Sequence, residues 1–253
     1  MDKMKEILSK LKDMGCSGIK ISFEDEGAQY NEIISMRYLT SQIGIELSVK
    51  IGGCEAKRDI IDCIDVGVDN IVAPMVESGF SLQKFLKSLQ CYNYNGKKGF
   101  NLETITSYNN LDDLSKHFNK LNFLTVGRHD FVDSLDQDKN YVDSELMLEY
   151  IKNIFKKCRE NNIMCCLGGN LSISSLKFIH TLIKEELLYK FETRYIIYDV
   201  HKIDFNDFEK LLHWGFLFEV EWLQYISNRY SLYANKDSKR IEMINERIKS
   251  NKQ

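Results

Sequence analysis

The feature that most constrains the fold is a regular alternation of short apolar runs with longer amphipathic stretches. The short runs are rich in Ile and Val, as in buried strands. The longer stretches space their apolar residues three or four positions apart, as in helices. Strands that alternate with helices form parallel β–α–β units, which build either a closed barrel or a doubly wound sheet. No Pro-, Gly- or Ser-rich linker interrupts the pattern, so we expect one domain.

The pattern predicts seven strands. They are Ile19–Phe23, Ile45–Ile51, Asn70–Ala73, Gly99–Leu102, Phe123–Val126, Ile163–Leu167 and Tyr195–Tyr198. Helices are expected at Met4–Met14, 28–42, Ala56–Val66, 80–90, 107–118, 144–160 and 172–187. From Asp204 onward the spacing predicts helix alone, with residues 1–235 forming the domain and 236–253 a polar helical tail. Periodicity by itself leaves the barrel and the open sheet undecided.

Composition excludes several functional classes. The chain has 253 residues, and its 34 Lys and Arg against 37 Asp and Glu give a net charge of −3, which provides no field to attract nucleic acid or an anionic membrane. Hydrophobic residues make up 43%, too many for a disordered chain. No segment approaches the roughly 20 apolar residues that cross a bilayer, and Met1–Glu6 lacks the apolar core of a signal peptide. We therefore expect a cytoplasmic protein without nucleic-acid or membrane partners.

Cysteine usage is also informative, because the chain has seven cysteines and none of them forms a CxxC pair. A zinc site or a disulfide framework would need such spacing or an even, compact set. We expect reduced and mostly buried thiols.

In parallel α/β folds, ligand-binding residues gather at the carboxyl ends of the strands. Carboxylates follow most of the predicted strands: Glu24, Asp25, Glu26, Glu77, Glu103, Asp130 and Asp199. Burying several carboxylates around one mouth is costly unless a metal cation or the side chains of Arg or Lys neutralise them. Hard oxygen ligands suit Mg²⁺ or Mn²⁺. The strand ends therefore predict a divalent metal site.

Each carboxylate also has a structural alternative. Asp25, Glu26 and Glu77 can cap the helices that follow them, where the helix dipole favours negative charge. Glu103 is followed by Thr104, Thr106 and Ser107, any of which can cap the next helix in its place. The Glu103 carboxylate is therefore freer to bind a ligand than those of Asp25, Glu26 and Glu77.

The order of these motifs resembles that of the HpcH/HpaI aldolase and citrate lyase β-subunit superfamily. Its LED, VPMV or VPKVE, IET, and IGPADL or FGAEDF motifs are similar to Phe23-Glu24-Asp25, Val72–Glu77, Leu102-Glu103-Thr104 and Val126–Phe131. Val49-Lys50-Ile51 stands where that family has an arginine-bearing strand. Each piece is weak alone, but the five occur in the family's order over residues 12–170.

The resemblance implies a single (β/α)₈-type TIM barrel, a divalent metal (Mg²⁺ or Mn²⁺), and reversible carbon–carbon bond chemistry through an enolate. Glu103 and Asp130 fall on the family's metal-ligand carboxylates. Lys50 stands at the position of the family's arginine, which binds the substrate's carboxylate or keto oxygen. A backbone N–H beside Gly127 or Arg128 would add a hydrogen bond to the substrate carboxylate. A metal-chelated keto acid has its developing enolate charge stabilised by the metal.

Two departures affect the expected catalytic groups. Lys50 keeps the charge of the family's arginine but loses its bidentate geometry. The aldolases' histidine after the first motif is absent, since Gly27 falls near its place. The acid/base candidates that remain are Glu26, Glu24 and His129.

A third departure concerns the barrel, because the family's first strand has no counterpart in the sequence. Either the barrel has seven strands or a C-terminal segment closes it. Features that bind coenzyme A are also not recognisable, so a free acid is the expected substrate.

The leading hypothesis is a metal-dependent carbon–carbon lyase or aldolase that acts on a small keto or hydroxy acid. One alternative is a non-catalytic barrel that serves as a binding or assembly subunit. Another is a Schiff-base aldolase using Lys50, since Lys20 precedes the end of its strand by several residues. In this superfamily a terminal helix often packs on a neighbouring subunit, so a homo-oligomer is expected.

Overall fold

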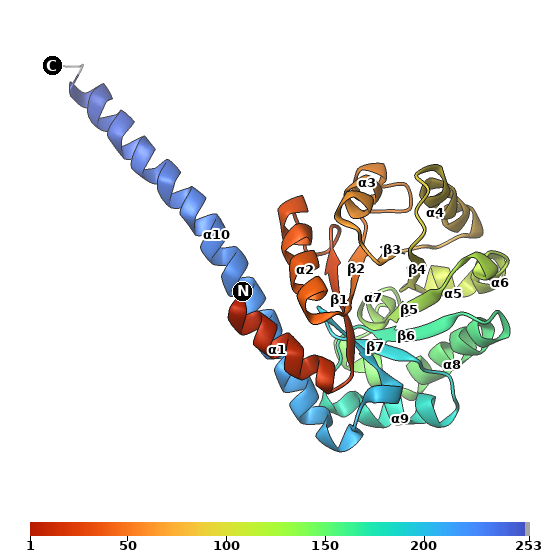
Figure 1. The fold of residues 1–253 in the computed structure, drawn as a ribbon. Coiled ribbons are helices and arrows are strands. Elements are labelled where there is room, and N and C mark those ends of the chain that lie inside the picture. The colour runs from red at the N-terminus through yellow and green to blue at the C-terminus, as the bar shows by residue number, and fades with distance from the viewer. Residues whose placement is uncertain (251–253) are drawn as a thin grey trace.

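In a computed structural model, which describes residues 1–250, the chain forms a closed eight-stranded barrel surrounded by helices (Figure 1). The strands are β1 (Cys16–Ser22), β2 (Glu46–Lys50), β3 (Asn70–Ala73), β4 (Lys97–Leu102), β5 (Phe123–Gly127), β6 (Met164–Gly168), β7 (Lys190–Glu192) and β8 (Ile196–Asp199). Strands β1 to β7 follow one another around the barrel in chain order, and each pairs in parallel with the next. The prediction of a TIM-type barrel is confirmed.

Strand β8 closes the barrel in the opposite direction. It pairs antiparallel with both β7 and β1, with Tyr198 opposite Cys16 at the start of β1. A C-terminal segment therefore takes the place of the missing first strand. The sequence-based expectation that Asp199 lies at the ligand-binding mouth is wrong, because an antiparallel strand ends at the opposite rim.

Helices α2 to α9 lie in the connections between the strands, α1 precedes β1, and α10 follows β8. They are α1 (Asp2–Asp13), α2 (Tyr30–Ile43), α3 (Lys57–Val66), α4 (Gly79–Cys91), α5 (Ile105–Asn109), α6 (Leu111–Ser115), α7 (Arg128–Asp133), α8 (Glu145–Glu160), α9 (Leu176–Lys184) and α10 (Phe208–Ser250). The single helix predicted at 107–118 is divided into α5 and α6, and the short α7 was not predicted. Ser144 caps α8 by accepting a hydrogen bond from the Met147 N–H, as expected.

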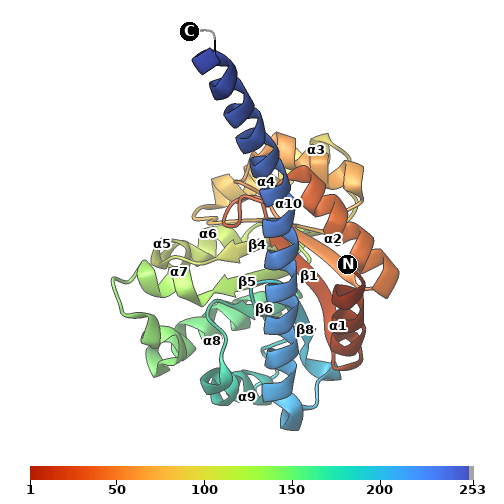
Figure 2. The ribbon, with the colours of Figure 1, turned by 90° about the vertical axis from the view of Figure 1, so that its left-hand side faces the viewer.

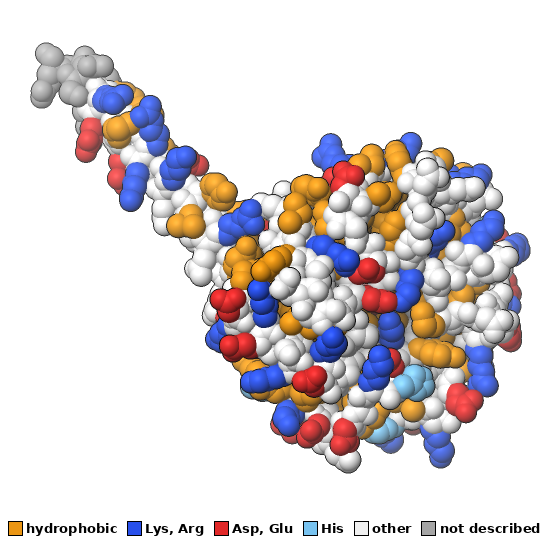
Figure 3. Space-filling model, viewed as in Figure 1, with side chains coloured by type: hydrophobic (Ala, Val, Ile, Leu, Met, Phe, Trp, Pro, Cys, Tyr) orange, Lys and Arg blue, Asp and Glu red, His pale blue; other side chains and the backbone are white. Residues whose placement is uncertain are grey.

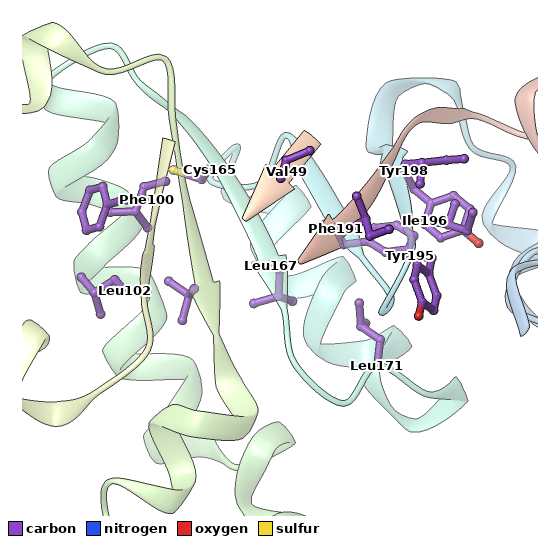
Figure 4. Close-up of a cluster of buried hydrophobic side chains, with 14 of the residues drawn as sticks. Val49, Phe100, Leu102, Cys165, Leu167, Leu171, Phe191, Tyr195, Ile196 and Tyr198 are labelled. Atoms are coloured by element: carbon purple, nitrogen blue, oxygen red, sulfur yellow. The ribbon is translucent and has the colours of Figure 1, made fainter. Parts of the chain in front are cut away.

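Strand alternation separates an apolar outer face of the barrel from a polar interior. Outward side chains such as Val49, Phe100, Leu102, Leu167 and Phe191 belong to the buried hydrophobic core, and Figure 4 shows this cluster. Inward positions carry polar residues that are buried or, in Lys20, half-buried: Lys20, Ser48, Lys50, Asn70, Asn101 and Glu192. Barrel interiors are normally filled by branched apolar side chains, so the polar filling indicates a functional interior.

Helix α10 is the longest element, with 43 residues. Its first part packs against the barrel and α1, and its C-terminal part projects into solvent (Figures 1 and 2). Figure 3 shows charged and apolar side chains mixed along this projection. The helix passes the expected boundary at residues 235 and 236 without a break, while 251–253 lie outside the described residues. Within residues 1–250, no helix is long and apolar enough to cross a membrane.

Most of the cysteines are buried, as predicted. All seven are free thiols; five are buried, Cys54 is half-buried and Cys91 is exposed. The adjacent Cys165 and Cys166 point to opposite sides of β6, since Cys165 lies against the Phe155 carbonyl of α8 and Cys166 faces Glu192 in β7.

Candidate functional site

A cavity of about 720 Å³ opens at the carboxyl ends of the parallel strands. Among the described residues that line it, seven are acidic and three are Lys or Arg. The acidic residues are Glu24, Asp25, Glu26, Glu103, Asp130, Glu192 and Glu219, and the basic ones are Lys20, Lys50 and Arg194. The excess of negative charge in one enclosed space makes this cavity the candidate active site.

Glu103, directly after β4, is held rigidly in this cavity and is only 1% exposed. One carboxylate oxygen accepts a hydrogen bond from the Met75 N–H at 2.8 Å, and the other accepts one from the Asn101 amide at 3.0 Å. Met75 has a φ of 44°, a strained conformation for a residue with a side chain. A Cβ on Gly127 would lie 2.7 Å from Glu103 Oε2, so the glycine is needed for this packing.

Thr104, rather than Glu103, caps the following helix, because its hydroxyl accepts a hydrogen bond from the Ser107 N–H at 3.1 Å. The prediction that the Glu103 carboxylate is free of capping is confirmed.

Lys50 and Asp130 complete this side of the cavity. The Lys50 ammonium lies 2.7 Å from Glu24 Oε2. Burial raises the pKa of both Glu103 and Asp130, and the charge of Lys50 opposes this increase in both. Glu103 and Asp130 therefore share one compensating lysine while burial disfavours their charged forms.

The donor set fits a divalent cation. Glu103 and Asp130 offer hard carboxylate oxygens in a partly enclosed cavity that also has room for water. A second possible arrangement shares Asp130, because its ligand atoms and those of His129 and the exposed Asp133 lie within 4.8 Å of one another. The structure brings all the predicted metal-binding and acid/base residues to the same cavity.

Glu26 is the most strongly perturbed of the acid/base candidates. One of its oxygens accepts a hydrogen bond from the Ser22 N–H at 2.8 Å, and Arg194 lies 3.6 Å from the other. Burial is the largest influence and raises the pKa of Glu26 to about 7. A carboxyl group that titrates near neutral pH is suited to both accepting and donating a proton.

The raised pKa predicts how Glu26→Gln changes stability with pH. Because the folded-state pKa lies above the unfolded value, the associated stability is present below about pH 4.5 and is lost as the pH rises through about 7. The variant should therefore gain stability relative to wild type over this range, by about 1–3 kcal/mol. Urea denaturation at several pH values, with chelator present, measures the difference. A difference that does not change with pH would contradict the assignment.

Arg128 uses its side chain for structure. The guanidinium is fully buried, forms an ion pair with Asp143, and donates to the carbonyls of Gly168 at 3.1 Å and Gly169 at 2.9 Å. Only the backbone N–H of Arg128 remains as a possible ligand contact. Gly169 packs closely against it, since a Cβ on Gly169 would lie 2.5 Å from this nitrogen. The guanidinium instead fixes the loop after β6 beside α7.

Lys20 also lines the cavity. The sequence had predicted that only Lys50 would reach the site, because Lys20 lies several residues before the end of its strand. Its ammonium lies 2.5 Å from Glu192 Oε1, inside the barrel. Burial alone would lower the pKa of Lys20, but the charge of Glu192 raises it above the usual range. Lys20 is therefore a poor nucleophile, since a Schiff base requires the neutral amine.

Known proteins are similar to this chain in structure but not detectably in sequence: neither a family model nor a curated protein matches it. An HpcH/HpaI aldolase from Desulfitobacterium hafniense DCB-2 superimposes with a TM-score of 0.61 at 9% identity, over 76% of this chain and 83% of that one. An HpcH/HpaI aldolase/citrate lyase family protein from Burkholderia cenocepacia J2315 gives 0.61 at 12% identity, over the same shares. The citrate synthase SbnG gives 0.58 at 13%, over 86% and 97%.

The chain has the HpcH/HpaI aldolase fold. The motif order found in the sequence and the superposition support each other, since both point to the same group of barrels. The sequence has no counterpart of the family's first strand, but the barrel is still closed, because β8 pairs with both β7 and β1.

Sequence reasoning missed several residues of the site in this HpcH/HpaI aldolase fold. Asn101 was detectable, since it lies two positions before Glu103 on the same face of β4. Glu192 and Arg194 were not, because β7 has only three residues and a single apolar one. Phe216 and Glu219 reach the cavity from α10, a contact that local sequence patterns do not encode.

Proposed function

We propose that the chain is a metal-dependent carbon–carbon lyase or aldolase that acts on a small keto or hydroxy acid through an enolate. The observation that carries this proposal is that two carboxylates, the buried Glu103 and the half-buried Asp130, line the same cavity as the ammonium of Lys50. The names of the structural neighbours, which are aldolases and a citrate synthase, support the same reaction class.

In this proposal Glu103 and Asp130 hold Mg²⁺ or Mn²⁺. The metal, when bound, supplies a Lewis acid that stabilises negative charge on the substrate's oxygens. Lys50 attracts the anionic substrate, and its ion pair with Glu24 fixes the direction of its side chain. The backbone N–H groups beside Gly127 and at Arg128 add donors for the substrate carboxylate.

Glu26 is the acid/base that we favour over Glu24 and His129. Its pKa of about 7 suits proton transfer in both directions. Glu24 is paired with Lys50, and His129 is partly exposed and lies 3.7 Å from the exposed carboxylate of Asp133. Glu26 would remove a proton from the carbon next to the substrate carbonyl and later return one.

The test is exchange of deuterium into the methyl group of pyruvate, followed by proton NMR with Mg²⁺ or Mn²⁺ present. The assay needs no second substrate, because it reports enolate formation alone. Exchange that depends on the metal supports the proposal. Absence of exchange, together with failure to bind metal or keto acid, would favour the non-catalytic barrel.

A Schiff-base mechanism at Lys50 predicts a different result. Borohydride treatment in the presence of pyruvate would then trap a covalent adduct that increases the protein mass. The metal mechanism predicts no adduct and complete loss of exchange in chelator.

We further propose that the protein is a cytoplasmic homo-oligomer whose α10 projection packs on another copy. Ile241, Ile244 and Ile248 are exposed at spacings of three and four on this projection. Most helical stability in proteins comes from packing of an apolar face, so a partner that covers these isoleucines would stabilise the projection. Truncation after Asn235 should leave the barrel folded and reduce the mass measured by light scattering to that of a monomer. An unchanged oligomer, or a monomeric full-length chain, would contradict this.

A further inference from the structure

The turn between β7 and β8 places an arginine at the mouth of the barrel. Because β8 runs antiparallel to β7, only Thr193, Arg194 and Tyr195 join the two strands. A connection between parallel strands would need about a dozen residues or more, usually including a helix. The antiparallel closure of the barrel therefore brings Arg194 to the cavity on a short turn.

Hydrogen bonds on both sides hold this turn in place. The Thr193 N–H donates to the Ile196 carbonyl at 2.9 Å, and the Ile196 N–H donates to the Thr193 hydroxyl at 3.2 Å. The Lys20 N–H of β1 donates to the Tyr195 carbonyl at 2.7 Å. Thr193 and Tyr195 are both buried. The backbone position of Arg194, between them, is therefore fixed.

The guanidinium of Arg194 bridges two neighbouring carboxylates. Its Nη2 lies 3.3 Å from Asp25 Oδ2, and its Nε lies 3.6 Å from Glu26 Oε1. Only 8% of the Glu26 side chain is exposed, and its other oxygen accepts the hydrogen bond from the Ser22 N–H. Arg194 and the backbone of β1 therefore hold the Glu26 carboxyl group from two sides. The fixed fork of a guanidinium suits such bridging better than an ammonium does.

Several other ionisable groups surround this contact: Lys20 on β1, Asp25 beside Glu26, Tyr195 in the turn, and Glu219 of α10 near Arg194. Burial has the largest influence on the pKa of Glu26 and raises it, whereas the charges of Lys20 and Arg194 lower it and that of Asp25 raises it. The Lys20 ammonium is already paired with Glu192. Arg194 is therefore the cation in direct contact with Glu26.

We propose that Arg194 is a positioning residue, which holds the Glu26 carboxyl group for proton transfer and favours its charged form. This inference rests on the proposed function. In the exchange reaction, the Glu26 carboxylate takes a proton from the methyl carbon of pyruvate, and the electron pair of that C–H bond forms the enolate double bond. A protonated Glu26 cannot accept this proton, so the neighbouring cation increases the fraction of active enzyme.

Arg194→Met tests this through the pH dependence of deuterium exchange, at saturating pyruvate and Mg²⁺. Wild-type exchange should rise with pH as Glu26 loses its proton, with a midpoint near the Glu26 pKa of about 7. Loss of the half-exposed guanidinium should move the midpoint up by about 0.5–1 pH unit. The rate relative to wild type should therefore be roughly three- to tenfold lower at about pH 6 than at about pH 9. A uniform loss at every pH, as from a purely structural role, would overturn the inference.

Two further variants separate charge from other effects of the substitution. Arg194→Lys keeps the positive charge, so its midpoint should lie close to that of wild type. Arg159→Met removes an exposed arginine that pairs with Glu186 and does not line the cavity, so it should leave the pH dependence unchanged. A midpoint in Arg194→Lys as high as in Arg194→Met, or a shifted midpoint in Arg159→Met, would overturn the inference.

A titration of the metal-free protein gives a readout that does not depend on turnover. Carbon-13 NMR of protein labelled at the glutamate carboxyl carbon follows Glu26, whose signal is assigned by its loss in Glu26→Gln. The midpoint of this signal should rise in Arg194→Met by the same amount as the midpoint of exchange. An unchanged NMR midpoint, with wild-type exchange intact, would overturn this inference alone. Absence of exchange in wild type, or full exchange in Glu26→Gln, would overturn the proposed role of Glu26 and this inference with it.

Discussion

Glu103→Ala and Asp130→Ala are each expected to lower metal-dependent deuterium exchange into pyruvate by roughly a thousandfold or more. The metal contributes several kcal/mol of charge stabilisation to such a step, and each 1.36 kcal/mol is a factor of ten in rate. Removal of either carboxylate should also abolish Mn²⁺ binding, which electron paramagnetic resonance measures directly. Wild-type-like exchange in either variant would refute the assignment.

The structure offers a conservative variant and a matched control for this experiment. Glu103→Gln keeps an oxygen acceptor for the Met75 N–H, so it separates loss of charge from loss of the loop contact. Asp133→Asn changes an exposed carboxylate of the alternative cluster with His129 and Asp130. It should bind Mn²⁺ like wild type. Loss of Mn²⁺ binding in Asp133→Asn would move the metal to that cluster.

Arg128→Met is expected to lower the free energy of unfolding by about 3–5 kcal/mol. The substitution leaves Asp143 partly buried without its ion-pair partner and removes hydrogen bonds to the carbonyls of Gly168 and Gly169. Breaking a buried pair from one side costs this much because the remaining charge is uncompensated. Urea denaturation measures the change.

Arg159→Met is the matched surface control. Arg159 is exposed and pairs with Glu186 at 3.3 Å, so its loss should change stability by less than about 0.5 kcal/mol. An equally small change in Arg128→Met would show that the buried guanidinium is not committed to the fold. The side chain would then be available to bind the substrate carboxylate.

Most of the barrel could be predicted from the sequence, because strands β1 to β6 contain short apolar runs or alternate apolar residues, a pattern distinct from the three- and four-residue spacing of the helices beside them. The direction of β8 could not. A four-residue strand has the same pattern in either direction, and pairing on both sides is a tertiary property. Asp199 was consequently assigned to the wrong rim.

The candidate site was likewise predicted only in part from the sequence. Glu103 and Asp130 follow well-marked strands, so the strand-end rule and the motif order placed both in the cavity. The Lys20–Glu192 pair joins residues 172 positions apart, and its second member lies in a strand with one apolar residue. The contact of α10 with the cavity likewise depends on how the helix packs. Local patterns predict elements, whereas charge pairs between distant strands depend on closure of the barrel.

The central claim is that a divalent ion at Glu103 and Asp130 enables enolate formation, and a single titration tests it. Mn²⁺ is added to the metal-free protein while bound ion and pyruvate exchange are recorded in the same sample. The account predicts that exchange is absent without metal and rises in proportion to one bound ion per chain. Exchange that persists in chelator, or a fully occupied site without exchange, would contradict it.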